Sequence, residues 1–153
     1  MTTLGYRWGY RIIAGALAGA AATTVLNLVT YLDMAVRGRP ASDTPAESAR
    51  RMARLAGTEL ESSSRADAVG ALLGYAAGIG SGVAYGVLTG GRMRGLPAAG
   101  VFTTLGMLAG NAPMTLLGVT DPREWSATDW LTDVVPHLAY GVTGAVVYRL
   151  LSG

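Results

Sequence analysis

Asp133 and the chain's single histidine, His137, stand four residues apart. On a helix both side chains lie on one face, where a carboxylate can hold the imidazole in one tautomer. The pair is therefore a candidate for acid–base chemistry. Asp133 also suits a helix N-terminus, and Pro136 is tolerated in a first helical turn, so the alternative is that these residues only begin a helix.

Further polar side chains interrupt stretches that are otherwise apolar. In hydrocarbon such groups need partners, and interhelical hydrogen bonds of roughly 0.6–2 kcal/mol each are an ordinary part of packing. The alternative is a path for a solute or a proton. We expect Asn27 and Asn111 to face each other. The candidate polar core comprises Asn27, Tyr85, Asn111, Asp133, His137 and Tyr140.

The composition excludes several kinds of chemistry. The chain has no cysteine and one histidine, so thiolate nucleophiles, iron–sulfur ligation and thiolate zinc sites are excluded and we expect no metal. It also lacks lysine and the Gly-x-Ser-x-Gly motif, so we expect no cofactor and favour a protein that is not an enzyme. The net charge of +2 comes from scattered arginines, which give no footprint for nucleic acid.

The charged residues are too few for a soluble domain. Only 14% of the 153 residues are charged, against roughly 25% in soluble proteins. Residues 12–32, 68–91 and 95–120 are uncharged over 21, 24 and 26 positions, and residues 134–148 over 15. At about 1.5 Å per residue, the first three can cross a hydrocarbon core about 30 Å thick, and flanking residues extend the fourth. We predict a single all-α membrane domain, a four-helix bundle with spans at about 12–34, 68–90, 96–118 and 130–151.

Glycine recurs every fourth residue through the second predicted span. A row of small residues lets helix backbones approach closely in lipid, so this span should be the centre of glycine-mediated close packing. The alternative is a groove for a flat ligand, a lipid tail or a partner helix. The predicted packing glycines are Gly70, Gly74, Gly78, Gly82, Gly86 and Gly90, facing Gly15 and Gly19 on the first span and Gly106 and Gly110 on the third.

Short local motifs mark the segments between the spans. The sequence Thr44-Pro45-Ala46-Glu47 predicts a capping box with proline at the first helical position, followed by a short amphipathic helix over about 45–60 on the bilayer surface. Ser126 and Asp129 predict a second capping box. Asp33 and Arg37, four apart, predict an interfacial ion pair.

The arginines indicate orientation and origin. The side with the termini has a purely basic short loop, which favours cytoplasmic termini. Basic residues that are all arginine, in a chain rich in alanine and glycine, indicate a GC-rich bacterial genome. The arginines on the side of the termini are Arg7, Arg11, Arg92, Arg94 and Arg149.

The stretch Pro136-His137-Leu138-Ala139-Tyr140-Gly141, preceded by glycine-rich spans, resembles the small uncharacterised bacterial inner-membrane proteins of the YagU type. The resemblance implies a multi-pass cell-membrane protein and transfers no catalytic residue.

Three functions follow from the residues. We favour an accessory or structural subunit that packs as a homo-oligomer or against a larger membrane complex, because the glycine row exceeds what one four-helix chain needs. The alternatives are a small channel or carrier for a solute or proton, and an interfacial lipid-binding protein or enzyme.

Overall fold

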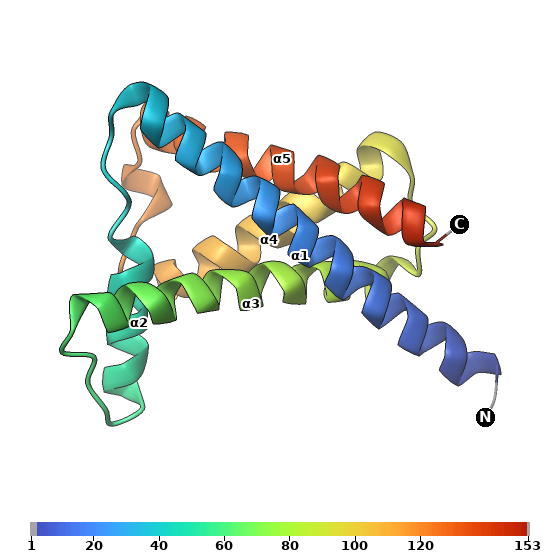
Figure 1. Cartoon of the computed structure of the whole chain (residues 1–153), viewed down its shortest axis with the longest axis horizontal. Coiled ribbons are helices and arrows are strands. Elements are labelled where there is room, and N and C mark those ends of the chain that lie inside the picture. The colour runs from blue at the N-terminus through green and yellow to red at the C-terminus, as the bar shows by residue number, and fades with distance from the viewer. Residues whose placement is uncertain (1–2, 153) are drawn as a thin grey trace.

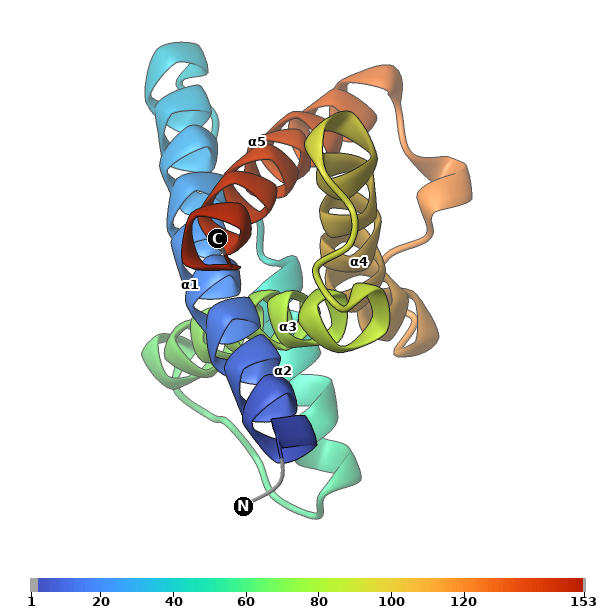
Figure 2. The ribbon, with the colours of Figure 1, turned by 90° about the vertical axis from the view of Figure 1, so that its right-hand side faces the viewer.

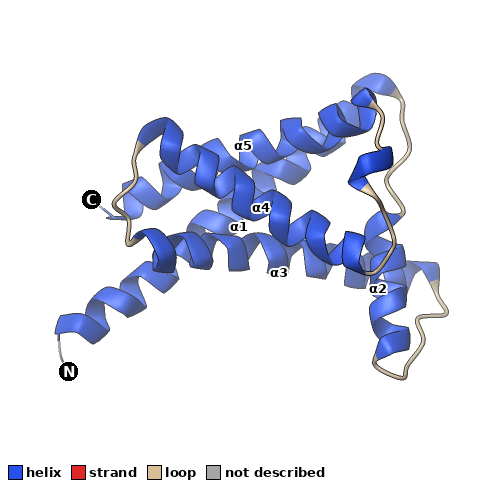
Figure 3. Ribbon diagram, turned by 180° about the vertical axis from the view of Figure 1, so that it is seen from behind, coloured by secondary structure: helices blue, strands red, loops and turns tan. Residues whose placement is uncertain are grey.

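The computed structural model describes residues 3–152, with side chains from Trp8 onward. The regular secondary structure of the described chain is all helix, with no strand (Figures 1 and 3), which confirms the predicted all-α class. The helices are α1 (Thr3–Arg37), α2 (Thr44–Leu55), α3 (Ser63–Thr89), α4 (Gly95–Leu116), the short 3-10 helix η1 (Pro122–Glu124) and α5 (Ala127–Ser152).

Three of the helices are long and apolar enough to cross a membrane. They are α1 over Trp8–Arg37, α3 over Ser63–Thr89 and α5 over Ala127–Ser152. The third predicted span, now α4, is not among these three helices. Its 22 residues include two prolines, three threonines and an asparagine, and these residues lower its mean hydropathy. The three apolar helices are those expected of a small membrane protein.

The four long helices run between two ends of the molecule that differ in their connections (Figures 1 and 2). The terminal end contains the start of α1, the α3–α4 connection and the end of α5. The loop end contains α2, the start of α3 and the segment from α4 to α5 that includes η1. Helix α1 packs on α3 and α5, and α4 packs on the same two helices from the other side.

Aromatic side chains fill the middle of the fold. Tyr85, Phe102 and Tyr140 are each at most 1% exposed, and Tyr148 is 3% exposed. The rings of Tyr85 and Phe102 stack with centroids 4.0 Å apart, and Tyr148 meets Tyr85 edge-on at 5.1 Å. Tyr140 meets Phe102 edge-on at 6.2 Å. Each such pair contributes about 0.5–1.5 kcal/mol beyond its buried area, so this aromatic block ties α3, α4 and α5 together.

The start of α2 corrects the predicted capping box. The N-cap is Asp43, not Thr44, and it makes no side-chain capping hydrogen bond. The Glu47 carboxylate instead lies 3.1 Å from the Arg51 Nε and 3.2 Å from an Arg54 guanidinium nitrogen. These arginines outcompete the backbone amide for the carboxylate, because hydrogen bonds between charged groups are the stronger ones. The Arg51 hydrogen bond is the largest cause that lowers the pKa of Glu47. The helix ends at Leu55, earlier than predicted.

Two other local predictions are confirmed. The Ser126 hydroxyl accepts the Asp129 N–H at 3.2 Å, and the Asp129 carboxylate accepts the Ser126 N–H at 2.9 Å, which is the reciprocal capping box expected at the start of α5. The Arg37 Nε lies 2.8 Å from the Asp33 carboxylate. Arg39 also binds that carboxylate at 2.6 Å, so the end of α1 has two cations around one anion.

Candidate functional site

Three of the predicted polar-core residues come together between α4 and α5. The Asn111 amide nitrogen donates to the Asp133 carboxylate at 3.0 Å. The Nδ1 atom of His137 lies 2.8 Å from the Asp133 backbone carbonyl and 3.5 Å from its carboxylate. The side chains of His137 and Asp133 are only 13% and 18% exposed. We refer to Asn111, Asp133 and His137 as the polar cluster.

Glycines on α4 make the space that the polar cluster occupies. A Cβ atom at Gly106 would lie 2.9 Å from the Tyr140 ring and 3.5 Å from the His137 ring, and one at Gly110 would lie 3.8 Å from the His137 Nε2. A larger side chain at Gly106 would therefore displace Tyr140. The imidazole fits against α4 because no side chain projects there.

The geometry selects one imidazole tautomer. The Asp133 carbonyl can only accept a hydrogen bond, so the close Nδ1 atom of neutral His137 carries the proton. The Nε2 atom is then an acceptor that points toward α4 at Gly110. The Nε2 atom can thus accept a hydrogen bond from a donor outside the cluster.

The two candidate tyrosines have structural partners. The Tyr140 hydroxyl donates to the Gly78 carbonyl of α3 at 2.7 Å, and the Tyr85 hydroxyl donates to the Met93 carbonyl at 3.4 Å. Both hydroxyl protons are used within the fold, as buried tyrosines require. Tyr140 is therefore placed next to the polar cluster along α5 but is bonded across to α3.

Asn27 lies apart from the other candidates. It is half-buried on α1, which packs on α3 and α5. The Asn111 amide on α4 donates to Asp133 rather than to Asn27. The expected pairing of the two asparagines is thus not formed in the described part of the chain, because α1 and α4 pack on opposite sides of α3 and α5.

The glycines of α1 and α3 lie where the two backbones approach most closely. A Cβ atom at Gly15 would lie 2.9 Å from the Val83 Cα, and one at Gly19 would lie 2.9 Å from the Ile79 Cα. A Cβ atom at Gly82 would lie 2.8 Å from the Gly19 Cα. Real Cβ atoms do not come this close to backbone atoms, so alanine at any of these positions would force a shift.

The remaining glycines of the α3 row have different neighbours. A Cβ atom at Gly70 would lie 2.7 Å from the Pro45 backbone of α2. A Cβ atom at Gly90 would lie 3.1 Å from the Arg11 guanidinium. Gly78 and Gly86 face α1 at Thr23 and Arg11, and only Gly74 of the row has no atom within 4 Å of its virtual Cβ. The row therefore contacts α1, α2 and Tyr148 of α5 within this one chain, whereas Gly106 and Gly110, predicted to face the row, lie against Tyr140 and His137 of α5.

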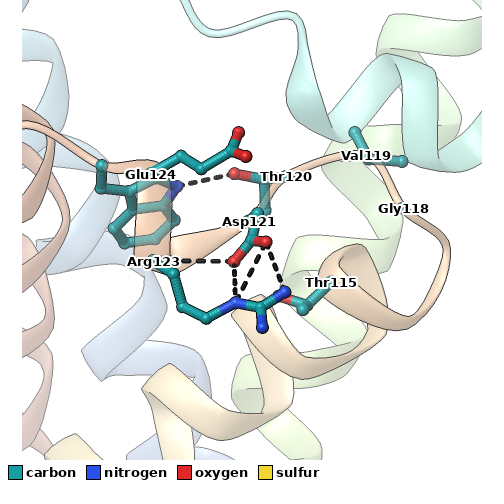
Figure 4. A pocket seen from close by; sticks show the side chains of 8 residues that line it. Thr115, Gly118, Val119, Thr120, Asp121, Arg123 and Glu124 are labelled. Atoms are coloured by element: carbon teal, nitrogen blue, oxygen red, sulfur yellow. Dashed lines mark hydrogen bonds and ion pairs between the residues drawn. The ribbon is translucent and has the colours of Figure 1, made fainter.

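A cavity of about 530 Å³ lies at the loop end beside the end of α4 (Figure 4). The side chain of Arg123 pairs with the Asp121 carboxylate at 2.7 Å, and these hydrogen bonds lower the pKa of Asp121 to about 2. The Trp125 indole donates to the Thr120 hydroxyl at 2.7 Å. The charges of Asp121 and Arg123 therefore neutralise each other, and Glu124 is a third charged residue that lines the cavity.

Sequence reasoning missed two polar contacts that position the site. The Ser81 hydroxyl, buried on α3, donates to the Ala77 carbonyl at 2.8 Å and also lies 3.2 Å from the Leu105 carbonyl of α4. Arg51 of α2 donates to the Leu117 carbonyl just after α4, at 2.6 Å. Ser81 directly precedes Gly82 of the glycine row, and this neighbourhood is a sequence signal that could have identified Ser81 as a buried polar residue. No local pattern indicates the partner of Arg51.

No family model, curated protein or solved structure matches the chain.

Proposed function

We propose that the chain is a small multi-pass protein of the bacterial cell (inner) membrane, in which α1, α3, α4 and α5 form a bundle through glycine contacts. Helices α3 and α5 are apolar enough to span, yet α3 ends at the terminal end and α5 begins at the loop end (Figure 1). The chain must therefore return through α4. With 22 residues, α4 is about 33 Å long at the usual rise, enough for a core of about 30 Å.

The orientation with cytoplasmic termini is part of this proposal. The connection between α3 and α4 is short and contains Arg92 and Arg94 without an acidic residue. Arginine in short loops is retained on the cytoplasmic side. We also propose a relation to the YagU-type proteins, on the motif from Pro136 to Gly141.

Within the membrane, the role we propose is that of an accessory or structural subunit. The observation behind it is the aromatic block, because the buried rings of Tyr85, Phe102 and Tyr140 fill the space between α3, α4 and α5. A solute has no room to pass such a centre in this conformation. The outer faces of the helices are then the surfaces on which the protein acts, in a homo-oligomer or a larger membrane complex.

Photo-crosslinking in the native membrane tests this role. A crosslinking residue at Leu72, which is 68% exposed on α3, should give a product with the mass of a second protein chain, whereas one at the buried Ala22 should not. Native mass spectrometry of the gently extracted protein should give the same partner in fixed stoichiometry. A chain that remains monomeric, and that crosslinks only to lipid from Leu72 and from Leu88 on the same helix, would refute the role.

A carrier of a small solute or proton is the second candidate, and the polar cluster favours it. Ionisable groups within membrane spans are costly, and they commonly mark proton or substrate pathways. Flux through proteoliposomes should then fall when Asn111 or His137 is replaced by alanine, whereas Thr104→Ala, an exposed position on α4, should have no effect. Flux that is unchanged in both cluster variants, or absent in the wild type, would exclude this candidate.

A further inference from the structure

The small net charge conceals a strong separation of charge along the molecule. Five arginines lie in the segments of the terminal end, and all ten acidic residues lie elsewhere in the sequence, with seven arginines. The formal charges are therefore +5 for the terminal end and −3 for the rest of the chain. The terminal end contains no aspartate or glutamate to neutralise its arginines.

The ion pairs follow this separation. Six arginines at the loop end pair with carboxylates, including Arg37 with Asp33 and Arg123 with Asp121. Among the described side chains of the terminal end, no arginine has an acidic partner. The positive charges of Arg11, Arg92, Arg94 and Arg149 are thus available to an anion from outside the chain.

Three of these arginines line one cleft. It has a volume of about 230 Å³ and lies between α1, the α3–α4 connection and α5. Arg11 contributes from α1, Arg94 from the residue before α4, and Arg149 from the last turns of α5. Arg92, although it belongs to the same connection, does not line the cleft.

The walls of the cleft position these arginines. The Arg11 guanidinium lies over Gly90, where a Cβ atom would be only 3.2 Å from its central carbon, and 5.5 Å from the centre of the Trp8 ring. Gly90 has φ +60, so a side chain would be strained there as well as crowded. The Tyr85 and Tyr148 rings close the inner side of the cleft against the aromatic block.

We propose that this cleft binds a phosphoryl group, and that its occupant is the head group of an anionic phospholipid. Arginine matches a phosphate with paired N–H donors, so three arginines from three segments form a receptor for that chemistry. The start of α4 adds backbone amides, since its N-cap residue, Arg94, makes no side-chain capping bond. The volume suits a head group better than a drug-sized ligand, whose pockets are roughly 300–1,000 Å³.

The position of the cleft favours a lipid over a soluble phosphate. Trp8 and Tyr10 lie beside it, and these residue types concentrate at the level of lipid head groups. Arginines at that level attract anionic lipids of the cytoplasmic leaflet. The inference depends on membrane insertion and not on the accessory role, so the two can fail separately.

The test compares lipid retention by native mass spectrometry after reconstitution in an equimolar mixture of phosphatidylglycerol and phosphatidylcholine. The wild-type protein should retain phosphatidylglycerol in preference. Arg94→Gln and Arg149→Gln, both at exposed positions where refolding is not at issue, should each reduce this retention about tenfold, the factor given by losing one charged hydrogen bond. Arg92→Gln is the matched control, with the same charge change at the same end, and should retain the lipid.

A second arm separates the two sources of a phosphoryl group. Inorganic phosphate added to lipid-free protein in detergent should raise the melting temperature little if the occupant is a lipid. If phosphate stabilises the wild type but not Arg149→Gln, and no preference for phosphatidylglycerol exists, the cleft is a phosphate site for a soluble ligand and the lipid assignment is wrong. Equal losses in Arg92→Gln and in the cleft variants, or no response in either arm, would refute the cleft itself.

Discussion

A single methyl group added at Gly82 should force α1 and α3 apart. In the structure a Cβ atom at this position would meet the Gly15 carbonyl and would lie 2.8 Å from both the Cα and the nitrogen of Gly19. All three are backbone atoms, which cannot rotate out of the way as a side chain can. Gly82→Ala therefore requires a movement of one helix against the other.

Gly74 provides the control for this substitution, because it lies in the same row on the same helix and has no atom within 4 Å of its virtual Cβ. Alanine is favoured over glycine in a helix by roughly 0.5–1 kcal/mol, so Gly74→Ala should stabilise the protein by that amount. Gly82→Ala gains the same propensity term but adds an overpacking cost of about 1–3 kcal/mol. The unfolding free energies of the two variants should thus differ by about 1–3 kcal/mol, with Gly82→Ala the less stable.

Reversible unfolding in mixed micelles, followed by circular dichroism as the denaturing detergent increases, measures this difference. Gly82→Leu should enlarge it, since a bulkier side chain meets the same backbone. If Gly82→Ala and Gly74→Ala have equal unfolding free energies, α1 and α3 do not pack through these glycines, and the central position given to α3 is refuted.

Three further perturbations test other contacts. Asp133→Ala removes the acceptor of the Asn111 amide and should cost about 1–3 kcal/mol of unfolding free energy, whereas Asp133→Asn keeps an oxygen acceptor and should cost less; equal losses in the same assay would refute the pairing. Arg51→Ala breaks the hydrogen bond from α2 to the end of α4 and should speed hydrogen exchange across α2; unchanged exchange would show that this bond does not hold α2. Because Asp121 has a pKa of about 2 in the folded chain, below the ordinary 3.8, its pairing with Arg123 should persist in full above pH 3.8 and be lost as the pH falls through 2. An NMR titration of the Asp121 carboxyl group with a midpoint near 3.8 would contradict this pairing.

The positions of the helices were largely predictable from the sequence because charge is expensive in a membrane. The uncharged stretches locate α1, α3, α4 and α5, and the Ser126 and Asp129 capping box locates the start of α5. The α2 cap was not predictable in the same way. Glu47 suits the backbone amide by spacing alone, but the arginines of the following turn are stronger partners for its carboxylate.

The sequence was enough to predict which residues belong to the site, but not which of them are in contact. The four-residue spacing correctly places Asp133 and His137 on one face of a helix. The partner of Asp133 depends on which helix α4 packs against, and spacing within one helix carries no information about that choice. Asn111 lies where α4 meets Asp133 of α5, so its amide reaches that carboxylate.

Most glycines of the row already pack against other helices of the same chain, and this changes where a partner helix would dock. A surface that is already in contact with α1 and α2 is unavailable to another protein, so Gly70, Gly78 and Gly82 do not argue for an accessory role. A partner must instead meet the outward faces, where α3 has Gly74 and Gly80 with no atom near their virtual Cβ positions. A bulky residue at Gly80 should then weaken association without lowering stability, whereas one at Gly82 should lower stability first. Association that survives Gly80→Leu and Gly74→Leu would place the partner on α1, α4 or α5 instead.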